Sequence, residues 1–255
     1  MPVAPGGGLN PVAGTSPFAW SSVASDSTGG KLIATVDGGA VYQSSNGGLM
    51  WTPLTGANRP GTNSWTASSS SGNGSVLVAV ADNDSGNSGV WVSVDGGATW
   101  SEQSAAAGGL PSPADWSSAA VSSDGSRITV TDASGQVWTS TNGGQSWSAV
   151  ASLPATGGWS GVSSSGDGSV VVVGQDGGSV WLSVDGGASW QEQNQQGDPP
   201  SPGSWASLVV SPDGSTVYAA DSAGSLWKYT ASTGAWTPLT TAGLAQLPGE
   251  GGSPC

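Results

Sequence analysis

Residues 159–190 read WSGVSSSGDGSVVVVGQDGGSVWLSVDGGASW and contain three tryptophans at a spacing that recurs along the chain. Trp181 follows Trp159 by 22 positions, and Trp190 follows Trp181 by nine. A similar arrangement recurs in four further segments, which begin at Trp20, Trp65, Trp116 and Trp205. In the segment from Trp65 the first spacing is 26, because the stretch 82–89 is longer, and in the segment from Trp20 the middle aromatic residue is Tyr42. The 14 tryptophans, together with Tyr42, fill every slot of this pattern, which indicates five repeats of about 45 residues each.

The composition of the 255 residues narrows the fold. The chain has 43 glycines and 16 prolines, and charged residues make up only 8% of it, so the residues that favour helices are too few for a mostly helical protein. Fourteen tryptophans and repeated valine runs argue against disorder. The composition therefore favours an all-β protein.

Charge excludes several classes of partner. The formal net charge is −13, and the chain has four cationic side chains in total. Four are too few to displace the counterions of a nucleic acid or to bind an anionic membrane surface. The apolar runs are too short to span a bilayer, so we expect no direct membrane insertion. The chain contains no histidine, and its one cysteine is the last residue, Cys255, so no internal disulfide forms.

Each repeat has the pattern of four short strands. A turn with glycine follows the first strand, as at Asp124-Gly125, and this dipeptide is typical of hairpins. The second strand, for example 170–173, is continuously apolar, which predicts that both of its faces are covered. Two more glycine-containing turns lead to the third and fourth strands.

Five such four-stranded antiparallel sheets predict a single five-bladed β-propeller, because one sheet cannot bury both of its faces alone. A parallel β-helix is the alternative, but its repeats are shorter and lack two hairpins each. The predicted propeller covers residues 20–241, with blades at about 20–64, 65–115, 116–158, 159–204 and 205–241. Residues 1–19 and 242–255 are Gly- and Pro-rich segments outside it.

The turn between the third and fourth strands carries the sharpest motif. It reads SVDGGATW at 93–100 and SVDGGASW at 183–190, with asparagine in place of aspartate at 44–51 and 140–147. This motif resembles the Asp-box (BNR) repeat, S-x-D-x-G-x-x-W, of sialidases, tandem-propeller glycoside hydrolases and the propeller assembly factor of photosystem II. In the fifth repeat, Ala231 and Ser232 replace the motif residues. The resemblance implies a structural role at the periphery of the blades for Asn46, Trp51, Asp95, Trp100, Asn142, Trp147, Asp185 and Trp190.

The residues do not support catalysis. The resemblance to sialidases implies three arginines around a substrate carboxylate, and the chain contains only Arg59 and Arg127. A glycosidase with two carboxylates needs an acid and a base on either side of a cleft, and the sequence identifies no such pair. We therefore expect no enzymatic activity, with a glycoside hydrolase built on an unrecognised acidic pair as an alternative.

The loops between second and third strands are acidic in every repeat. On one face of a propeller they would form a ring that suits Ca²⁺ or sugar hydroxyls, although aspartate is also an ordinary turn residue. The long loops between repeats add polar side chains. The candidate ligand face consists of Asp37, Asp82, Asp84, Asp132, Asp176, Asp221, Asn63 and Arg59. We expect no cofactor, with Ca²⁺ as the alternative.

The repeats differ in the length and content of their loops, whereas a lectin would show the same polar residues in each blade. We therefore interpret the chain as a non-catalytic binding or scaffold module for protein–protein interaction in an extracytoplasmic assembly. The partner is a protein or, in a lectin-like alternative, a glycan. The low charge and the Gly-, Ser- and Thr-rich composition favour a secreted, cell-surface or organelle-lumen location.

Overall fold

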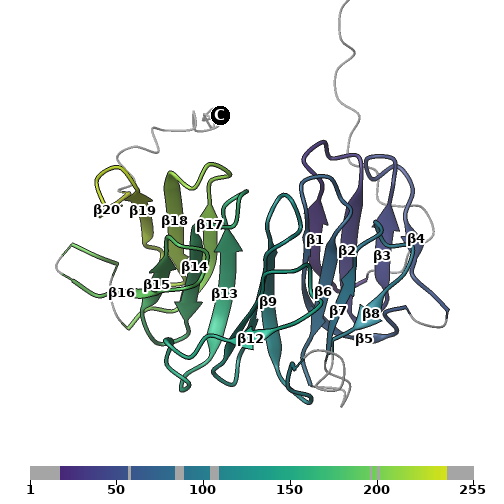
Figure 1. The fold of residues 1–255 in the computed structure, drawn as a ribbon, viewed down its shortest axis with the longest axis horizontal. Helices are drawn as coiled ribbons and strands as arrows, with labels where there is room; N and C mark the ends of the chain where they lie inside the picture. The colour runs from purple at the N-terminus through teal and green to yellow at the C-terminus, as the bar shows by residue number, and fades with distance from the viewer. Residues whose placement is uncertain are drawn as a thin grey trace, which may run out of the picture. The chain divides into compact units, whose positions relative to one another are not determined.

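The structure is a computed structural model, and it describes residues 18–56, 59–83, 89–103, 109–195, 197–199 and 202–239. Regular structure in these residues consists of 20 β-strands, with no helix among them (Figure 1). No helix in the described ranges is therefore long and apolar enough to cross a membrane. The predicted terminal segments 1–19 and 242–255 fall outside the description, apart from residues 18 and 19.

The strands fall into five consecutive groups of four, here called repeats 1 to 5. Repeat 1 contains β1 (Trp20–Ser25), β2 (Leu32–Gly39), β3 (Val41–Ser44) and β4 (Thr52–Pro53). Repeat 2 contains β5 (Asn63–Ser70), β6 (Leu77–Ala81), β7 (Gly89–Ser93) and β8 (Ser101–Glu102). Repeat 3 contains β9 (Trp116–Val121), β10 (Ile128–Asp132), β11 (Val137–Ser140) and β12 (Ser148–Ala149). Repeat 4 contains β13 (Trp159–Ser164), β14 (Val171–Gln175), β15 (Val180–Ser183) and β16 (Gln191–Gln193). Repeat 5 contains β17 (Trp205–Val210), β18 (Thr216–Asp221), β19 (Leu226–Thr230) and β20 (Ala235–Pro238).

Repeats 3, 4 and 5 each form a separate four-stranded antiparallel sheet, as the sequence predicts. The prediction of separate sheets is wrong for repeats 1 and 2, whose eight strands form one sheet joined by β2 and β5. Asp37 pairs with Ser64 and Gly39 pairs with Asn63. Both strands are eight residues long, so their ends extend beyond their own hairpins and meet.

The chain divides into two compact units, residues 1–128 with 140–147 and residues 129–139 with 148–255. The first unit holds repeats 1 and 2, and the second holds repeats 4 and 5. Repeat 3 contributes residues to both units.

The second strands bear out the prediction from continuous apolarity in four repeats. All five residues of β6 and β10 are buried, as are the first four of β14 and residues 33–36 of β2. The prediction is wrong for β18, in which Tyr218 is 38% exposed. Within the described residues, Tyr218 is thus more exposed than Val78 and Val172 at the same position of β6 and β14.

Each unit has a core in which one repeat packs against the next. In the first, Ile33 and Val41 of repeat 1 cluster with Trp65, Leu77 and Trp100 of repeat 2. In the second, residues of repeat 4 cluster in the same way with residues of repeat 5: Val172, Val180, Leu182, Trp205, Val217 and Trp236. The broad indole rings supply much of the apolar area that these junctions remove from water.

Polar side chains organise the first turn of the repeats. In repeat 3, the Asp124 carboxylate accepts hydrogen bonds from the Ser122 hydroxyl at 2.6 Å and the Ser126 backbone N–H at 2.9 Å. Gly125 has φ of +75°, and a Cβ atom there would collide with the Val76 side chain of repeat 2. Glycine is therefore required at this turn for both conformation and space.

Backbone bonds also connect the turns of consecutive repeats. The Ser27 N–H donates to the Gly72 carbonyl, and the Gly72 N–H donates to the Ser123 carbonyl, each at 2.9 Å. In the second unit, the Gly166 N–H donates to the Pro212 carbonyl at 2.8 Å. These contacts use main-chain atoms and so do not depend on particular side chains.

Candidate functional site

The third turns of repeats 1 to 4 share one hydrogen-bonded geometry. In repeat 2, the Ser93 hydroxyl donates to Asp95 at 2.9 Å and accepts from the Gly97 N–H at 2.8 Å. Asp95 also accepts from the Thr99 N–H at 2.8 Å and the Thr99 hydroxyl at 2.6 Å. The same bond to the N–H four residues further on is made by Asn46, Asn142 and Asp185. We call these four segments (44–51, 93–100, 140–147 and 183–190) the Ser-x-Asx turns.

The carboxylates of the Ser-x-Asx turns are stabilised in their charged form. The bond from the Thr99 hydroxyl, with that from the Thr99 N–H, lowers the pKa of Asp95 to about 2. The Ser189 hydroxyl and N–H likewise lower the pKa of Asp185 to about 2. Such carboxylates are poor proton donors at neutral pH, which fits the structural role that we expect for them.

The tryptophans that close the Ser-x-Asx turns differ in burial. Trp100 is 4% exposed and Trp147 is 7% exposed, so both lie in the interior. Trp51 and Trp190 are half-buried. Trp190 therefore presents part of its indole ring to solvent.

The fifth repeat lacks this geometry. Its third and fourth strands continue to pair up to Thr230 and Ala235, so the turn between them is confined to residues 231–234. The Gly234 N–H donates to the Thr230 carbonyl at 2.9 Å and closes this turn. The short turn leaves Tyr229 and Trp236 opposite each other, with ring centroids 5.4 Å apart.

Three residues of the candidate ligand face meet at the start of β5. Asp37 pairs with Ser64, the Asp82 N–H donates to the Ser64 carbonyl at 3.1 Å, and Asn63 is the buried neighbour of Ser64. Asp84 lies outside the described residues. The pairing of β2 with β5 therefore brings Asp37, Asn63 and Asp82 together, a contact that the sequence alone does not reveal.

Of the remaining acidic candidates, Asp132 and Asp221 are the last residues of β10 and β18, and Asp176 lies in the turn after β14. The buried Asp132 accepts from the Ser134 N–H at 2.8 Å and hydroxyl at 2.6 Å, and Asp221 accepts from the Ala223 N–H at 2.7 Å. Asp176 is exposed. Within the described ranges, no group of three or more His, Cys, Asp or Glu side chains could hold a metal ion.

Arg59 lies beside a Ser-x-Asx turn. Its guanidinium donates to the carbonyls of Gly97 at 3.2 Å and Ala98 at 2.8 Å. Gln43 donates to the neighbouring Gly96 carbonyl at 2.5 Å. Two hollows of about 550 Å³ flank Arg59, but its guanidinium is engaged with the turn rather than directed at a ligand.

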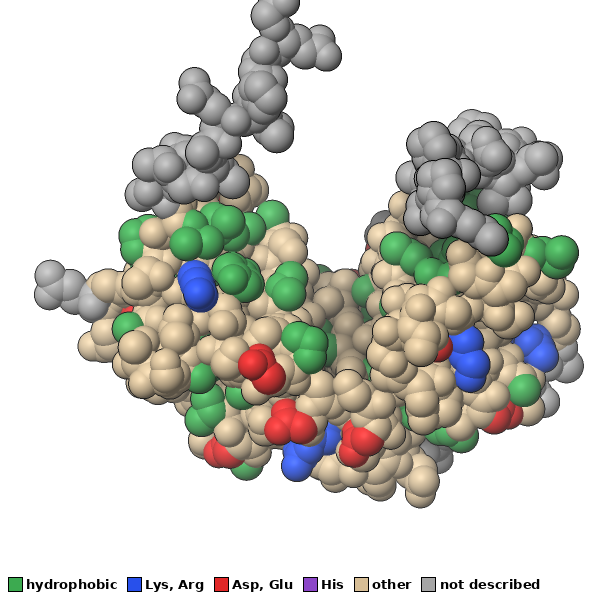
Figure 2. All heavy atoms as spheres, turned by 90° about the horizontal axis from the view of Figure 1, so that it is seen from above, with side chains coloured by type: hydrophobic (Ala, Val, Ile, Leu, Met, Phe, Trp, Pro, Cys, Tyr) green, Lys and Arg blue, Asp and Glu red, His purple; other side chains and the backbone are tan. Residues whose placement is uncertain are grey.

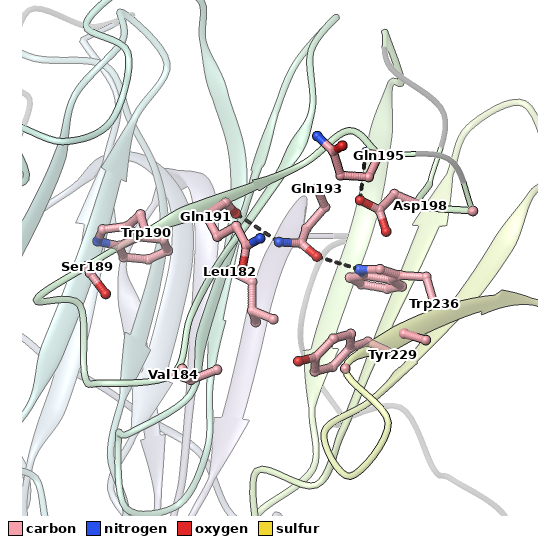
Figure 3. A pocket seen from close by; sticks show the side chains of 13 residues that line it. Leu182, Val184, Ser189, Trp190, Gln191, Gln193, Gln195, Asp198, Tyr229 and Trp236 are labelled. Carbon is pink, nitrogen blue, oxygen red and sulfur yellow. Dashed lines mark hydrogen bonds between the residues drawn. The ribbon is translucent and has the colours of Figure 1, made fainter.

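The most distinctive hollow lies between β16 and β20 in the second unit, and we call it the β16–β20 groove (Figure 3). Its volume is about 450 Å³. Buried side chains form its floor: Leu182, Gln193, Tyr229 and Trp236. More exposed residues form its rim: Val184, Ser189, Trp190, Gln191, Gln195, Asp198 and Ala235.

Most polar groups of the groove are already bonded within the protein. The Gln193 side chain accepts from Trp236 Nε1 at 2.9 Å and donates to the Gln191 carbonyl at 3.0 Å. Trp190 Nε1 donates to the Gly187 carbonyl at 3.0 Å. Asp198 accepts the Gln195 N–H at 2.8 Å and is the one carboxylate among the described lining residues, which include no lysine or arginine. The groove thus offers aromatic and aliphatic surface with a single negative charge.

Sequence reasoning missed this groove. The available signal was the loss of the motif in the fifth repeat, combined with glutamine three positions after a motif tryptophan in repeats 2 and 4, at Gln103 and Gln193. The Gln103 side chain accepts from Trp147 Nε1 at 3.2 Å, in the same way as Gln193 accepts from Trp236. Charged side chains are sparse on the face seen in Figure 2, so charge alone does not single out a site.

Comparison with known proteins places the chain by its fold. No protein-family model matches the sequence, and no curated protein matches it. A GH74 enzyme from Niastella koreensis is similar in structure over 89% of this chain, with a TM-score of 0.69 and 20% identity. YCF48 bound to D1 peptide is similar over 88% of the chain, with a TM-score of 0.61 and 15% identity. The nidogen/laminin complex is similar over 88%, with a TM-score of 0.60 and 11% identity. These likenesses, with the all-β sheets, show a β-propeller fold.

The chain is short relative to the enzymes that it resembles. It spans 38% of the Niastella koreensis enzyme and 39% of a GH74 xyloglucanase from Xanthomonas campestris. It spans 70% of the YCF48 chain and 79% of the chain from the nidogen/laminin complex.

Proposed function

We propose that the chain is a five-bladed, non-catalytic β-propeller with Asp-box turns that binds a protein partner in an extracytoplasmic assembly. The count of five blades is supported by the five consecutive groups of four strands. The Asp-box assignment is supported by the shared hydrogen bonds of the four Ser-x-Asx turns.

The observation that carries the proposed function is the β16–β20 groove. Its floor presents Leu182, Tyr229 and Trp236, and its rim presents Val184 and the partly exposed ring of Trp190. These surfaces suit apolar side chains of an extended peptide segment, because aromatic anchors in pockets dominate protein recognition. Two of the proteins of similar fold are bound to a peptide or to another protein, YCF48 to D1 peptide and nidogen to laminin.

The negative charge of the groove indicates which kind of peptide segment would bind best. Asp198 stands at the groove without a neighbouring cation among the described lining residues, and the chain carries a net charge of −13. A basic side chain in the bound segment would pair with Asp198, and the negative field of the chain would speed its encounter. We therefore infer an extended, basic and partly apolar segment as the ligand.

The internal bonding of the groove disfavours a sugar. Sugar hydroxyls need free donors and acceptors, but the amides of Gln193 and Gln195 and the indole N–H of Trp190 already have partners. Breaking the bonds of the buried Gln193 to bind hydroxyls would leave polar groups unpaired, which is costly in a buried site.

Selection from a phage library of random linear peptides tests the proposal. We expect enriched peptides to combine basic and apolar residues, and Val184→Lys to weaken a synthetic copy of the winning peptide at least about tenfold, equivalent to about 1.4 kcal/mol. Val94→Lys is the matched control, because Val94 occupies the same position in the turn of repeat 2 and is 61% exposed, against 60% for Val184. Asp198→Asn should weaken binding of the basic peptide. The binding that remains should depend less on the salt concentration, because one ion pair has been lost.

Three results would contradict the peptide-binding proposal. These are no enrichment, enrichment of acidic peptides, and equal effects of Val184→Lys and Val94→Lys. Each would show that the groove does not bind basic peptides.

The glycan and enzyme alternatives rest on the partly exposed Trp190 and on the GH74 likeness. They are tested together with xyloglucan, the class of polysaccharide named by the Xanthomonas campestris neighbour. We expect neither binding in titration calorimetry nor release of reducing ends. Binding that Val184→Lys abolishes would establish the glycan alternative, and release of reducing ends would overturn the non-catalytic assignment.

The extracytoplasmic location is a separate part of the proposal and rests on composition alone. Protease protection of the full chain in intact native cells or organelles tests it. If the protease digests the chain as soon as the plasma membrane is lysed, but not before, the chain lies in the cytoplasm and the proposed location is wrong.

A further inference from the structure

Asparagine precedes glycine at three places in the chain, 46–47, 73–74 and 142–143. This dipeptide is especially prone to deamidation, because glycine has no side chain to hinder the approach of its backbone nitrogen to the asparagine amide carbon. The pairs at 46–47 and 142–143 occupy the same position of a Ser-x-Asx turn, and a second glycine follows each of them. Both turns belong to the first unit, so the chain presents one reactive sequence in two comparable settings.

The backbone of the glycine is held alike at all three places. The glycine has φ between +66° and +69° in each case. Its N–H donates one backbone hydrogen bond of 2.9 Å, from Gly47 to Gly30, from Gly74 to Ser71 and from Gly143 to Ser126. The attacking nitrogen must be released from this bond at every site, so a difference in reactivity has to come from the asparagine side chain and its surroundings.

The two equivalent asparagines differ in how the leaving nitrogen is held. Oδ1 accepts the backbone N–H four residues further on at 2.9 Å in both turns. In repeat 3, the Asn142 Nδ2 also donates to the Ser146 hydroxyl at 2.8 Å. Met50 occupies this position in repeat 1, and a thioether is only a weak acceptor. The Asn46 Nδ2 therefore has no hydrogen-bond acceptor among the described residues, and its amide is the less restrained of the two.

The third asparagine is held more firmly than Asn46. The Asn73 Oδ1 accepts from the Ser71 hydroxyl at 2.9 Å, and from the Ser75 N–H at 2.9 Å and hydroxyl at 2.7 Å. Gly74 is buried, whereas Gly47 is exposed. The water and base that the reaction needs reach the nitrogen of Gly47 more readily than that of Gly74.

We propose that Asn46 is a site of spontaneous deamidation, which converts the turn of repeat 1 to the aspartate form of the motif. The Gly47 nitrogen loses its proton and forms a bond to Cγ of Asn46, the bond from Cγ to Nδ2 breaks, and ammonia leaves with a proton. Water then hydrolyses the resulting cyclic imide at one of its two carbonyls. One opening gives aspartate, the residue found at Asp95 and Asp185, and the other gives isoaspartate, in which the main chain runs through the side-chain carbon.

This modification is independent of the proposed peptide site. The described lining residues of the β16–β20 groove lie between positions 182 and 236, outside repeat 1. Failure of either proposal therefore leaves the other standing.

Incubation of the full chain in mildly alkaline buffer, followed by peptide mass spectrometry, measures conversion at the three asparagines. We expect Asn46 to convert at least about fivefold faster than Asn142, equivalent to about 1 kcal/mol, because Asn142 makes one more hydrogen bond. Asn73 should also convert more slowly than Asn46. Met50→Ser should slow conversion of Asn46 to the rate of Asn142, and Ser146→Met should speed conversion of Asn142.

The same incubation in urea controls for sequence, because the unfolded chain lacks the hydrogen bonds of the turns. Asn46 and Asn142 should then convert at similar rates, and circular dichroism verifies that both variants fold without urea. The proposal is overturned if Asn46 does not convert in the folded chain, or if Asn142 or Asn73 converts as fast. Unchanged rates in the two variants, or the same ratio of rates in urea, would overturn it as well.

Discussion

The junction between repeats 1 and 2 and the junction between repeats 4 and 5 use equivalent positions with different chemistry. In the first, Gln43 reaches across to the Gly96 carbonyl, and Leu54 occupies the position next to Trp100. In the second, Leu182 takes the place of Gln43, and Gln193 takes the place of Leu54 and accepts from Trp236. Polar and apolar roles are thus exchanged between the two positions.

This exchange leaves a different defect in each junction. In the first, the Trp100 indole N–H is buried without a hydrogen-bond partner, because leucine cannot accept one. In the second, the Trp236 indole N–H has a hydrogen-bond acceptor in Gln193, but among the described residues no side chain is seen to bridge to the short turn of repeat 5, where the β16–β20 groove lies. A repeat protein can therefore vary one junction for stability and another for binding while its backbone pattern stays the same.

The largest expected effect comes from Leu182→Ala, with Gln43→Ala as its counterpart. Leu182 is 5% exposed in an apolar core, so its loss should lower the free energy of unfolding by about 2–5 kcal/mol. Gln43→Ala removes one hydrogen bond and should cost about 1 kcal/mol. Urea denaturation of both variants measures the difference, and equal costs would refute the exchange of roles.

Gln193→Leu converts the second junction to the chemistry of the first. It leaves the buried Trp236 N–H without its acceptor and should cost about 1–3 kcal/mol of unfolding free energy. Gln103→Leu is the matched control, since Gln103 accepts from Trp147 in the same way. Thermal and urea unfolding measure both, and a stabilised Gln193→Leu variant would contradict the assignment of this bond.

Leu54→Gln makes the reverse change. The new amide can accept from Trp100 Nε1, so the substitution should cost at least about 1 kcal/mol less than Leu77→Gln, a buried leucine in the same cluster. Urea denaturation compares the two variants. Equal costs would show that the unpaired indole N–H does not limit stability.

The smallest effect concerns acid, and it compares Ser-x-Asx turns that carry aspartate with those that carry asparagine. The pKa of Asp95 and Asp185 is lowered to about 2 from 3.8, so the unfolded chain takes up these protons first as the pH falls. Their contribution is complete above about pH 4 and is lost as the pH falls toward about 2. The double variant Asp95→Asn/Asp185→Asn lacks these two carboxylates. Its free energy of unfolding should therefore fall less than that of the wild type when the pH is lowered from about 5 to about 3.

Asn46→Asp is the converse control, and it should add acid sensitivity to the turn of repeat 1. Urea midpoints at the two pH values measure all three proteins. Identical pH dependence of the wild type and the double variant would show that these carboxylates do not contribute to acid unfolding.

The tryptophan spacing was sufficient to predict all-β repeats of four strands and the positions of their turns. It predicts them because apolar side chains at a fixed period specify which faces are buried. The spacing could not reveal the pairing of Asp37 with Ser64, which depends on how far two strands extend beyond their hairpins.

The candidate site was less accessible to sequence reasoning. The acidic residues were visible as turn formers, and Asp132 and Asp221 do accept bonds within their own turns. The β16–β20 groove depends on the distance between a turn and the neighbouring strand. That distance cannot be predicted from the types of residue in the sequence. The sequence signals that point to the groove are the loss of the motif at Ala231 and the glutamine at position 193.

The backbone bonds from Ser27 to Gly72, from Gly72 to Ser123 and from Gly166 to Pro212 have an evolutionary consequence. A newly duplicated repeat needs no compensating mutation to make this bond, because every amino acid supplies a carbonyl and all but proline supply an amide. Gene duplication can therefore lengthen such an array first and refine its side chains later.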